Sequence, residues 1–325
     1  MEEATRYFDR GLARANMGDL DGAIADWTQA IRLNPQYAAA YYNRGVARAR
    51  NGDLDGAIAD YTEAIRLNPQ LAEAYTNRGV ARADKGDLDG AIADCTEAIR
   101  LNPQDAAAYY NRGVARARNG DLDGAIADYT EAIRLNPQFA AAYYIRGLAR
   151  ADKGDLDGAI ADYTEAIRLN PQLAAAYYNR GVARARNGDL DGAIADYTEA
   201  IRLNPQYAEA YNNRGNACAD KGDLDGAIAD YTEAIRLNPQ YADAYNNRGV
   251  DRADKGDLDG AIADHTQAIR LNPQDAKAYN NRGLARADKG DLDGAIADHT
   301  ESIRLNPQDA EAYNAQRHGI LNHVG

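Results

Sequence analysis

The chain has 325 residues, with 37 Lys and Arg against 50 Asp and Glu, and a net charge of −13. This negative charge opposes binding to nucleic-acid phosphates and to anionic membrane surfaces, so we expect neither as a partner. Residues 1–7 lack the basic start and apolar run of a signal peptide, and no segment is apolar over the length of a membrane span, which predicts a cytoplasmic protein. The two cysteines, Cys95 and Cys218, lie several repeats apart and argue against a disulfide framework.

A period of 34 residues runs through almost the whole chain and is marked by its prolines. A repeat of this length with a helical pattern inside it is typical of a solenoid, in which each unit buries its apolar face only against its neighbours. We therefore expect the function to lie on an extended surface and not in a single pocket. The prolines are Pro35, Pro69, Pro103, Pro137, Pro171, Pro205, Pro239, Pro273 and Pro307.

Each repeat is predicted to form two helices, as residues 38–71 illustrate. The Ala-rich first half favours a helix that ends at Asn51-Gly52, where glycine can adopt the left-handed conformation of a helix end. Asp53 is a typical cap for a second helix. That helix should end at Asn68, because a residue before proline is pushed out of the α region. The period thus predicts an all-α fold built from helical hairpins.

Aromatic, small and proline residues recur at fixed places and give the unit a pattern that resembles the tetratricopeptide repeat: Tyr41, Gly45, Ala57, Tyr61, Ala64 and Pro69. The resemblance implies a right-handed superhelical α-solenoid of helix-turn-helix repeats, with a single domain over residues 1–325. A last partial segment, residues 310–325, departs from the pattern and is expected to cap the stack. The full repeats begin at residues 4, 38, 72, 106, 140, 174, 208, 242 and 276.

Arginine occupies a place on the first helix where the family has leucine, on the side expected to face the second helix. An arginine there is costly unless it is paired, and the second helix offers an aspartate, such as Asp60 for Arg44. We therefore predict partly buried Arg–Asp pairs with a structural role inside each hairpin. The arginines are Arg44, Arg78, Arg112, Arg146, Arg180, Arg214, Arg248 and Arg282.

The other side of the first helix carries a stripe at Ala39, Tyr42, Asn43 and Val46, with the spacing of one helix face. The resemblance implies that this stripe lines a concave groove for extended peptides or partner helices. Stacking of the repeats places the asparagines of the stripe in a row, here called the ladder. Their side-chain amides can form hydrogen bonds with successive peptide groups of a partner, whatever the side chains of that partner. The alternative is that the asparagines solvate the face or bond to the neighbouring repeat. The ladder comprises Asn43, Asn77, Asn111, Asn179, Asn213, Asn247 and Asn281.

A second ladder beside the first changes character along the chain, from Tyr42, Tyr110, Tyr144 and Tyr178 to Asn212, Asn246 and Asn280. Tyrosine combines a large apolar face with a polar tip, so we expect the N-terminal half to prefer apolar or aromatic side chains of a partner. Packing between adjacent helices is the other role open to these tyrosines. Acidic residues gather on the stripe in the second half and favour Lys or Arg there: Asp220, Asp254 and Asp288.

Opposite charges alternate at one position of the stripe, as at Arg50 in one repeat and Asp84 in the next. Adjacent first helices bring equivalent positions close together. We therefore expect exposed ion pairs between them, each contributing about 0–1 kcal/mol.

Patterns that imitate catalytic or metal sites have simpler explanations. Asn51-Gly-Asp53-Leu-Asp55-Gly begins like a calcium-binding EF-hand loop, but its twelfth position, which requires a bidentate carboxylate, is Thr62. Turn and capping chemistry is therefore preferred, and no metal site is predicted. His265 and His299 replace the tyrosine of the second helix and are expected to be packed. No nucleophile–base constellation, phosphate loop or cofactor motif stands out, which argues against an enzyme.

The sequence therefore favours a non-enzymatic interaction scaffold that holds an extended, neutral-to-basic peptide segment in a concave groove. One alternative is a structural protein that assembles with itself, because near-identical stacked units offer matching surfaces. Another is an engineered, consensus-like scaffold without a natural ligand. The scattered departures from the repeat argue against that last alternative.

Overall fold

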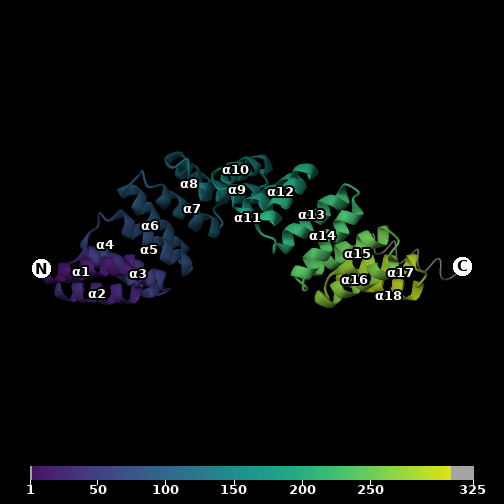
Figure 1. Cartoon of the computed structure of the whole chain (residues 1–325), viewed down its shortest axis with the longest axis horizontal. Helices are drawn as coiled ribbons and strands as arrows, with labels where there is room; N and C mark the ends of the chain where they lie inside the picture. The colour runs from purple at the N-terminus through teal and green to yellow at the C-terminus, as the bar shows by residue number, and fades with distance from the viewer. Residues whose placement is uncertain (1, 309–325) are drawn as a thin grey trace. The chain divides into compact units, whose positions relative to one another are not determined.

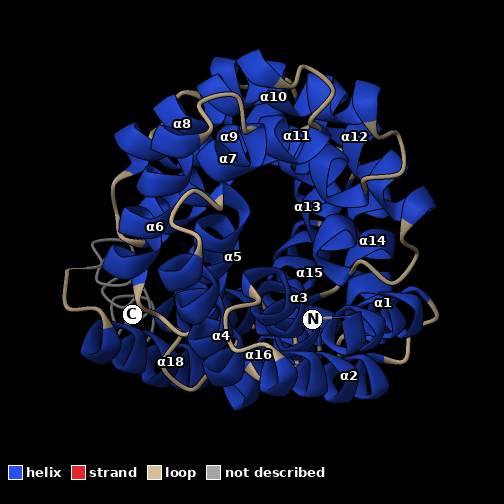
Figure 2. Cartoon of the chain, turned by 90° about the vertical axis from the view of Figure 1, so that its left-hand side faces the viewer, coloured by secondary structure: helices blue, strands red, loops and turns tan. Residues whose placement is uncertain are grey.

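In the computed structural model, which describes residues 2–308, every regular element is an α-helix, and short loops join consecutive helices (Figure 2). Each repeat forms one hairpin, with an odd-numbered first helix and an even-numbered second helix (Figure 1). The all-α architecture of helix pairs that the sequence predicted is confirmed. Residues 310–325, predicted to be a cap, lie outside the described residues.

The helices have closely similar bounds from hairpin to hairpin. The first helices are α1 (Glu2–Asn16), α3 (Ala38–Arg50), α5 (Ala72–Asp84), α7 (Ala106–Arg118), α9 (Ala140–Asp152), α11 (Ala174–Arg186), α13 (Ala208–Asp220), α15 (Ala242–Asp254) and α17 (Ala276–Asp288). The second helices are α2 (Leu20–Leu33), α4 (Leu54–Leu67), α6 (Leu88–Leu101), α8 (Leu122–Leu135), α10 (Leu156–Leu169), α12 (Leu190–Leu203), α14 (Leu224–Leu237), α16 (Leu258–Leu271) and α18 (Leu292–Leu305).

The turn inside each hairpin follows the local chemistry of its residues. Gly52 has a φ of 82°, in the left-handed region that glycine enters without steric cost. Asp53 accepts a hydrogen bond from the backbone N–H of Gly56 at 2.9 Å and so caps α4. The aspartate that imitates a calcium ligand is therefore a helix cap.

Small residues bring the two helices of a hairpin close together. Ala40, Ala57 and Ala64 are completely buried. A Cβ added at Gly113 of α7 would lie 2.6 Å from Cε1 of Tyr129 in α8, so only glycine lets the tyrosine ring reach this position. The core is a narrow strip of alanines and large aromatic side chains and has no single centre.

The described chain divides between Leu169 and Asn170 into two compact units. The first unit, residues 2–169, contains α1 to α10, and the second unit, residues 170–308, contains α11 to α18. Within each unit, a second helix packs on its own first helix and on the first helix of the next hairpin. The expectation of one continuous domain stays a prediction.

Candidate functional site

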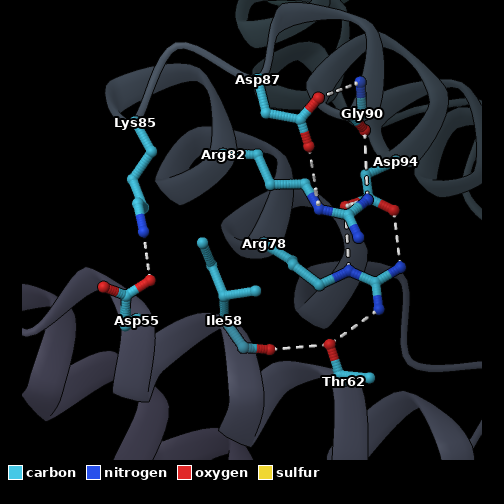
Figure 3. Close-up of polar contacts among 9 residues, drawn as sticks. All are labelled: Asp55, Ile58, Thr62, Arg78, Arg82, Lys85, Asp87, Gly90 and Asp94. Carbon is cyan, nitrogen blue, oxygen red and sulfur yellow. Dashed lines mark hydrogen bonds and ion pairs between the residues drawn. The ribbon is translucent and has the colours of Figure 1, made fainter.

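Two arginines of α5 converge on one aspartate of α6 (Figure 3). Arg78 binds Asp94 through two hydrogen bonds, from Nε to Oδ2 at 2.9 Å and from Nη2 to Oδ1 at 2.7 Å. Arg82 donates from Nη1 to the same Oδ2 at 2.8 Å. Asp94 is 4% exposed, so these charge-assisted bonds replace the water that burial removes.

Within each unit, the same cluster joins a hairpin to the preceding one. Arg78 Nη1 donates to Thr62 Oγ1 of α4 at 3.1 Å, and Lys85 pairs with Asp55 at the start of α4 (Figure 3). The arginines therefore have the structural role that the sequence predicted. Equivalent pairs are Arg44–Asp60, Arg112–Asp128, Arg146–Asp162, Arg180–Asp196, Arg214–Asp230, Arg248–Asp264 and Arg282–Asp298.

On the predicted stripe, a hollow of about 480 Å³ lies between α3 and α5. Tyr42 and Arg50 of α3 line it together with Asn77 and Asp84 of α5. No ion pair joins Arg50 to Asp84 within residues 2–308, so the expected charge pairing between adjacent first helices is wrong at this pair. The side chains of Arg50 and Asp84 both line the hollow without forming an ion pair across it.

A second hollow of the first unit, about 300 Å³, lies between α7 and α9 and is more apolar. Val114 of α7 and Leu148 of α9 line it, together with Ile145, which replaces the ladder asparagine. The first unit therefore offers apolar surface on this stripe, in keeping with the preference that the sequence predicted for it.

The stripe tyrosines also pack on the tyrosine of the second helix in the same hairpin. Tyr42 lies 6.0 Å from Tyr61 between ring centroids, and burial raises the pKa of the Tyr42 phenol. Tyr42 is half-buried, so one part of the ring packs and another part faces the hollow. The same tilted ring contact joins Tyr110 to Tyr129, Tyr144 to Tyr163 and Tyr178 to Tyr197.

Several ladder asparagines bond to the preceding hairpin of their unit. Asn77 donates from Nδ2 to the Tyr42 hydroxyl at 3.1 Å, and Asn213 donates to the Tyr178 hydroxyl at 2.9 Å. The equivalent bonds run from Asn247 to Asn212 and from Asn281 to Asn246, both at 3.2 Å. The alternative in which these asparagines bond to the neighbouring repeat is confirmed. Such a bond also fixes the orientation of the amide.

The remaining ladder asparagines have different surroundings. Asn43 donates to the backbone oxygen of Ala39 in its own helix at 3.0 Å. Asn111 and Asn179 are half-buried on α7 and α11. The asparagines at this position therefore differ in how much of each amide is already used in hydrogen bonds.

In the second unit, the asparagines that replace the stripe tyrosines are largely buried, and two of them, Asn212 and Asn246, also line a hollow of about 730 Å³. Asn212 and Asn280 are only 4% and 7% exposed. Asn280 and Asn246 form hydrogen bonds with the ring Nδ1 of His299 and His265, at 3.1 and 3.0 Å. Burial lowers the pKa of His265 to about 4, so the ring is neutral near pH 7.

The acidic residues of the second unit remain accessible on the stripe. Asp220, Asp254 and Asp288 are exposed at the ends of α13, α15 and α17. Asp254 and Asp288 line a hollow of about 210 Å³ between α15 and α17. Asp220 lines another of about 400 Å³ between α13 and α15, together with Asp251, a residue that the sequence pattern marks only as a departure from alanine.

Other kinds of site find no support within residues 2–308. No group of three or more His, Cys, Asp or Glu side chains there is arranged to hold a metal ion. Among these same residues, no helix has the length and apolar character needed to cross a membrane.

Family models of tetratricopeptide repeats match most of the chain. Two models described as tetratricopeptide repeat match residues 8–72, 57–106, 76–138 and 178–242, and residues 276–309. A model described as TPR repeat matches residues 147–188 and 251–290. No curated protein matches the chain.

Solved structures of repeat proteins share the fold at low sequence identity. YrrB, described as a TPR protein with an unusual peptide-binding site, is 23% identical, covers 58% of this chain and 97% of its own, and gives a TM-score of 0.51. A tetratricopeptide repeat protein from Parabacteroides merdae is 21% identical over 77% of this chain and 98% of its own, with a TM-score of 0.56. A chain of the Cut9–Hcn1 hetero-tetramer of the APC/C is 17% identical over 97% of this chain and 76% of its own, with a TM-score of 0.57.

Proposed function

The chain belongs to the tetratricopeptide repeat family, and from this premise we propose that it is a non-enzymatic scaffold that binds an extended peptide segment along the stripe of its first helices. The peptide backbone bonds to the ladder asparagines, and hollows between successive first helices take its side chains. The partner is a protein or peptide whose bound segment is neutral to basic.

The observation that carries this proposal is the orientation of the ladder amides. At Asn77, one N–H of the amide is used on the hydroxyl of Tyr42, while the second N–H and the carbonyl oxygen are left for another group. An amide held in this way loses little further conformational entropy when a peptide group binds to it. Tethering by the neighbouring repeat therefore favours peptide binding and does not compete with it.

Charge and apolar surface on the stripe support a preference along the bound segment. The hollow of the first unit at Ile145 and Leu148 is apolar, whereas Asp220, Asp254 and Asp288 line hollows of the second unit. We infer that apolar side chains of the peptide bind the first unit and basic side chains bind the second. The peptide-binding site described for YrrB supports the general mode alone, because identity to that protein is low.

The test is binding of a library of unstructured peptides of varied charge to the whole chain. The decisive variant is Asn43→Ala with Asn111→Ala. Asn43 bonds within its own helix and Asn111 is half-buried on α7, so the fold should tolerate both changes. The matched control is Gln70→Ala with Gln104→Ala, two exposed amides in the loops between hairpins.

Binding that is broad in peptide sequence, weakened in the asparagine variant and unchanged in the glutamine control supports the proposal. Binding that is equally strong in both variants contradicts a role of the asparagines in holding the backbone. No binding by the parent, with a mass that grows with concentration in light scattering, would instead favour self-assembly.

A further inference from the structure

Asp251 occupies a position of the first helix that is alanine in the other hairpins. The side chain at this position points into the narrow space between helices and is buried in most hairpins. A carboxylate here carries a large desolvation cost, and nothing in the repeat pattern requires it. The equivalent residues are Ala13, Ala47, Ala81, Ala115, Ala149, Ala183, Ala217 and Ala285.

The carboxylate of Asp251 is buried without an internal partner. The residue is 5% exposed, and its Oδ2 has no hydrogen bond among the described residues. The basic side chains of α13 and α15 are already engaged, since Arg214 pairs with Asp230 and both Arg248 and Arg252 pair with Asp264. No basic side chain of α13 or α15 therefore neutralises the charge of Asp251.

The charged groups that line the hollow beside Asp251 are both carboxylates. Within it, the Tyr231 hydroxyl and Asn247 Nδ2 both donate to Asn216 Oδ1, at 2.9 and 3.0 Å. Because those donors are used on Asn216, the oxygens of Asp251 and Asp220 are the charged groups left facing the hollow. Burial, together with the nearby carboxylates of Asp254 and Asp220, raises the pKa of Asp251 to about 6.

We propose that this hollow, the Asp251 pocket, receives the cationic end of a Lys or Arg side chain of the bound peptide. The ammonium or guanidinium group forms an ion pair with the unpartnered carboxylate of Asp251. The pocket volume of about 400 Å³ accommodates a long side chain. A side chain suits the pocket better than a metal ion, because the described residues provide no three-ligand group. The inference rests on the proposed peptide-binding function and adds a residue that selects the partner.

The experiment compares short, acetylated and amidated peptides that differ only at one central residue, which is Lys, Arg or the uncharged norleucine. Each is titrated into the parent chain and into Asp251→Ala and Asp251→Asn. The alanine variant restores the residue found in the other hairpins, so it is expected to fold. Glu233→Gln is the matched control, since it removes one negative charge from α14 at a residue that pairs with Arg236 and does not line the pocket.

The expected result is that the parent binds the Lys and Arg peptides about tenfold or more tightly than the norleucine peptide. That preference should disappear in both Asp251 variants and persist in Glu233→Gln. Peptides that bind without a charge preference, or with one that survives in Asp251→Ala, overturn the pocket and leave the scaffold function standing. Failure of every peptide to bind the parent overturns both.

Discussion

The two units are built from the same hairpin, but the later hairpins of the second unit join their helices by different chemistry. In the first unit, Tyr42 and Tyr110 of the first helices pack at a tilt against Tyr61 and Tyr129 of the second helices. In the later hairpins of the second unit, an asparagine on the first helix bonds to a histidine on the second, as Asn246 does to His265. Both residues differ from the tyrosine pair in these hairpins, 19 positions apart in each case, whereas Asn212 is followed 19 positions later by the unchanged Tyr231.

This difference shows that the hairpin tolerates a change of interaction type when both partners change. An aromatic pair stabilises through buried area and ring contact, whereas the Asn–His pair requires a hydrogen bond because both groups are polar and buried. Thr76 and Cys95 form a third, smaller combination at the same two positions. We expect single substitutions at these positions to cost more than paired ones.

The largest contrast is expected at the aspartate that binds the arginines. Asp128 of the first unit receives Arg112 and Arg116, but Asp230 of the second unit receives Arg214 alone, because Cys218 replaces the second arginine. Asp128→Ala should lower local stability by about 3–5 kcal/mol, since it leaves partly buried Arg112 without a carboxylate and leaves Arg116 only its longer pair with Asp121 at 3.7 Å. Hydrogen exchange of the amides in the affected hairpin measures the loss.

Asp230→Ala is the comparison, and a smaller loss is expected because this substitution removes one ion pair, with Arg214, instead of two. Equal losses at the two aspartates would show that the second arginine contributes nothing. Stability should be read hairpin by hairpin, because long repeat arrays unfold in more than one step.

The next effect is a dependence on pH that belongs to the second unit. His265 has a folded pKa of about 4 against an ordinary value of 6.5, so the unfolded chain binds the proton more readily. The stability of this hairpin should be complete above pH 6.5 and fall by about 3 kcal/mol as the pH approaches 4. Hydrogen exchange in α15 and α16, corrected for the intrinsic effect of pH, follows the change.

The double variant Asn246→Tyr with His265→Tyr restores the tyrosine pair of the first unit and should remove this part of the pH dependence. The difference between parent and double variant isolates the histidine from carboxylates that titrate in the same window. An unchanged pH profile in the double variant would contradict the assignment to His265.

A third, opposite effect is expected at Asp251. Replacing its buried, unpartnered carboxylate by alanine should stabilise the α15 hairpin by about 1–3 kcal/mol at neutral pH. Because the folded pKa is about 6 and the ordinary value is 3.8, the carboxylate costs most above pH 6, and the gain should shrink as the pH falls through 6. Thermal unfolding of parent and variant across this range measures it. Asp254→Ala, at an exposed residue, should show no comparable gain.

The smallest expected effect on stability comes from giving the second unit an arginine that the first unit has at the equivalent position. Cys218→Arg supplies Asp230 with a second arginine, and we expect a gain of about 0.5–1 kcal/mol because the equivalent arginines are only partly buried. Cys218→Ala should give no gain. A stability of Cys218→Arg no higher than that of Cys218→Ala, in the same denaturation series, would contradict this view of the cluster.

Much of the fold could be predicted from the sequence because its causes are local. The cap at Asp53, the left-handed Gly52 and the end of the second helix before Pro69 each depend on a few adjacent residues. The Arg–Asp pairs were also predictable, because helical periodicity within one hairpin puts both partners on facing sides.

The state of the candidate site was less predictable because it depends on contacts between hairpins. The ladder position of Asn77 follows from periodicity, but its bond to Tyr42 requires the stacking distance of two hairpins. The predicted pairing of Arg50 with Asp84 failed for the same reason, since equivalent positions line one hollow without meeting.

The sequence by itself determined the hairpin, its boundaries and the stripe on which binding is proposed, because each follows from residue type and helical period. Only the tertiary structure decided which side chains on that stripe are available. Burial distinguished Asn212, which is only 4% exposed, from exposed Asp220, and it left Asp251 without a partner. The physical reason is that desolvation and hydrogen-bond satisfaction depend on every element packed around a group, which the linear pattern of one repeat does not contain.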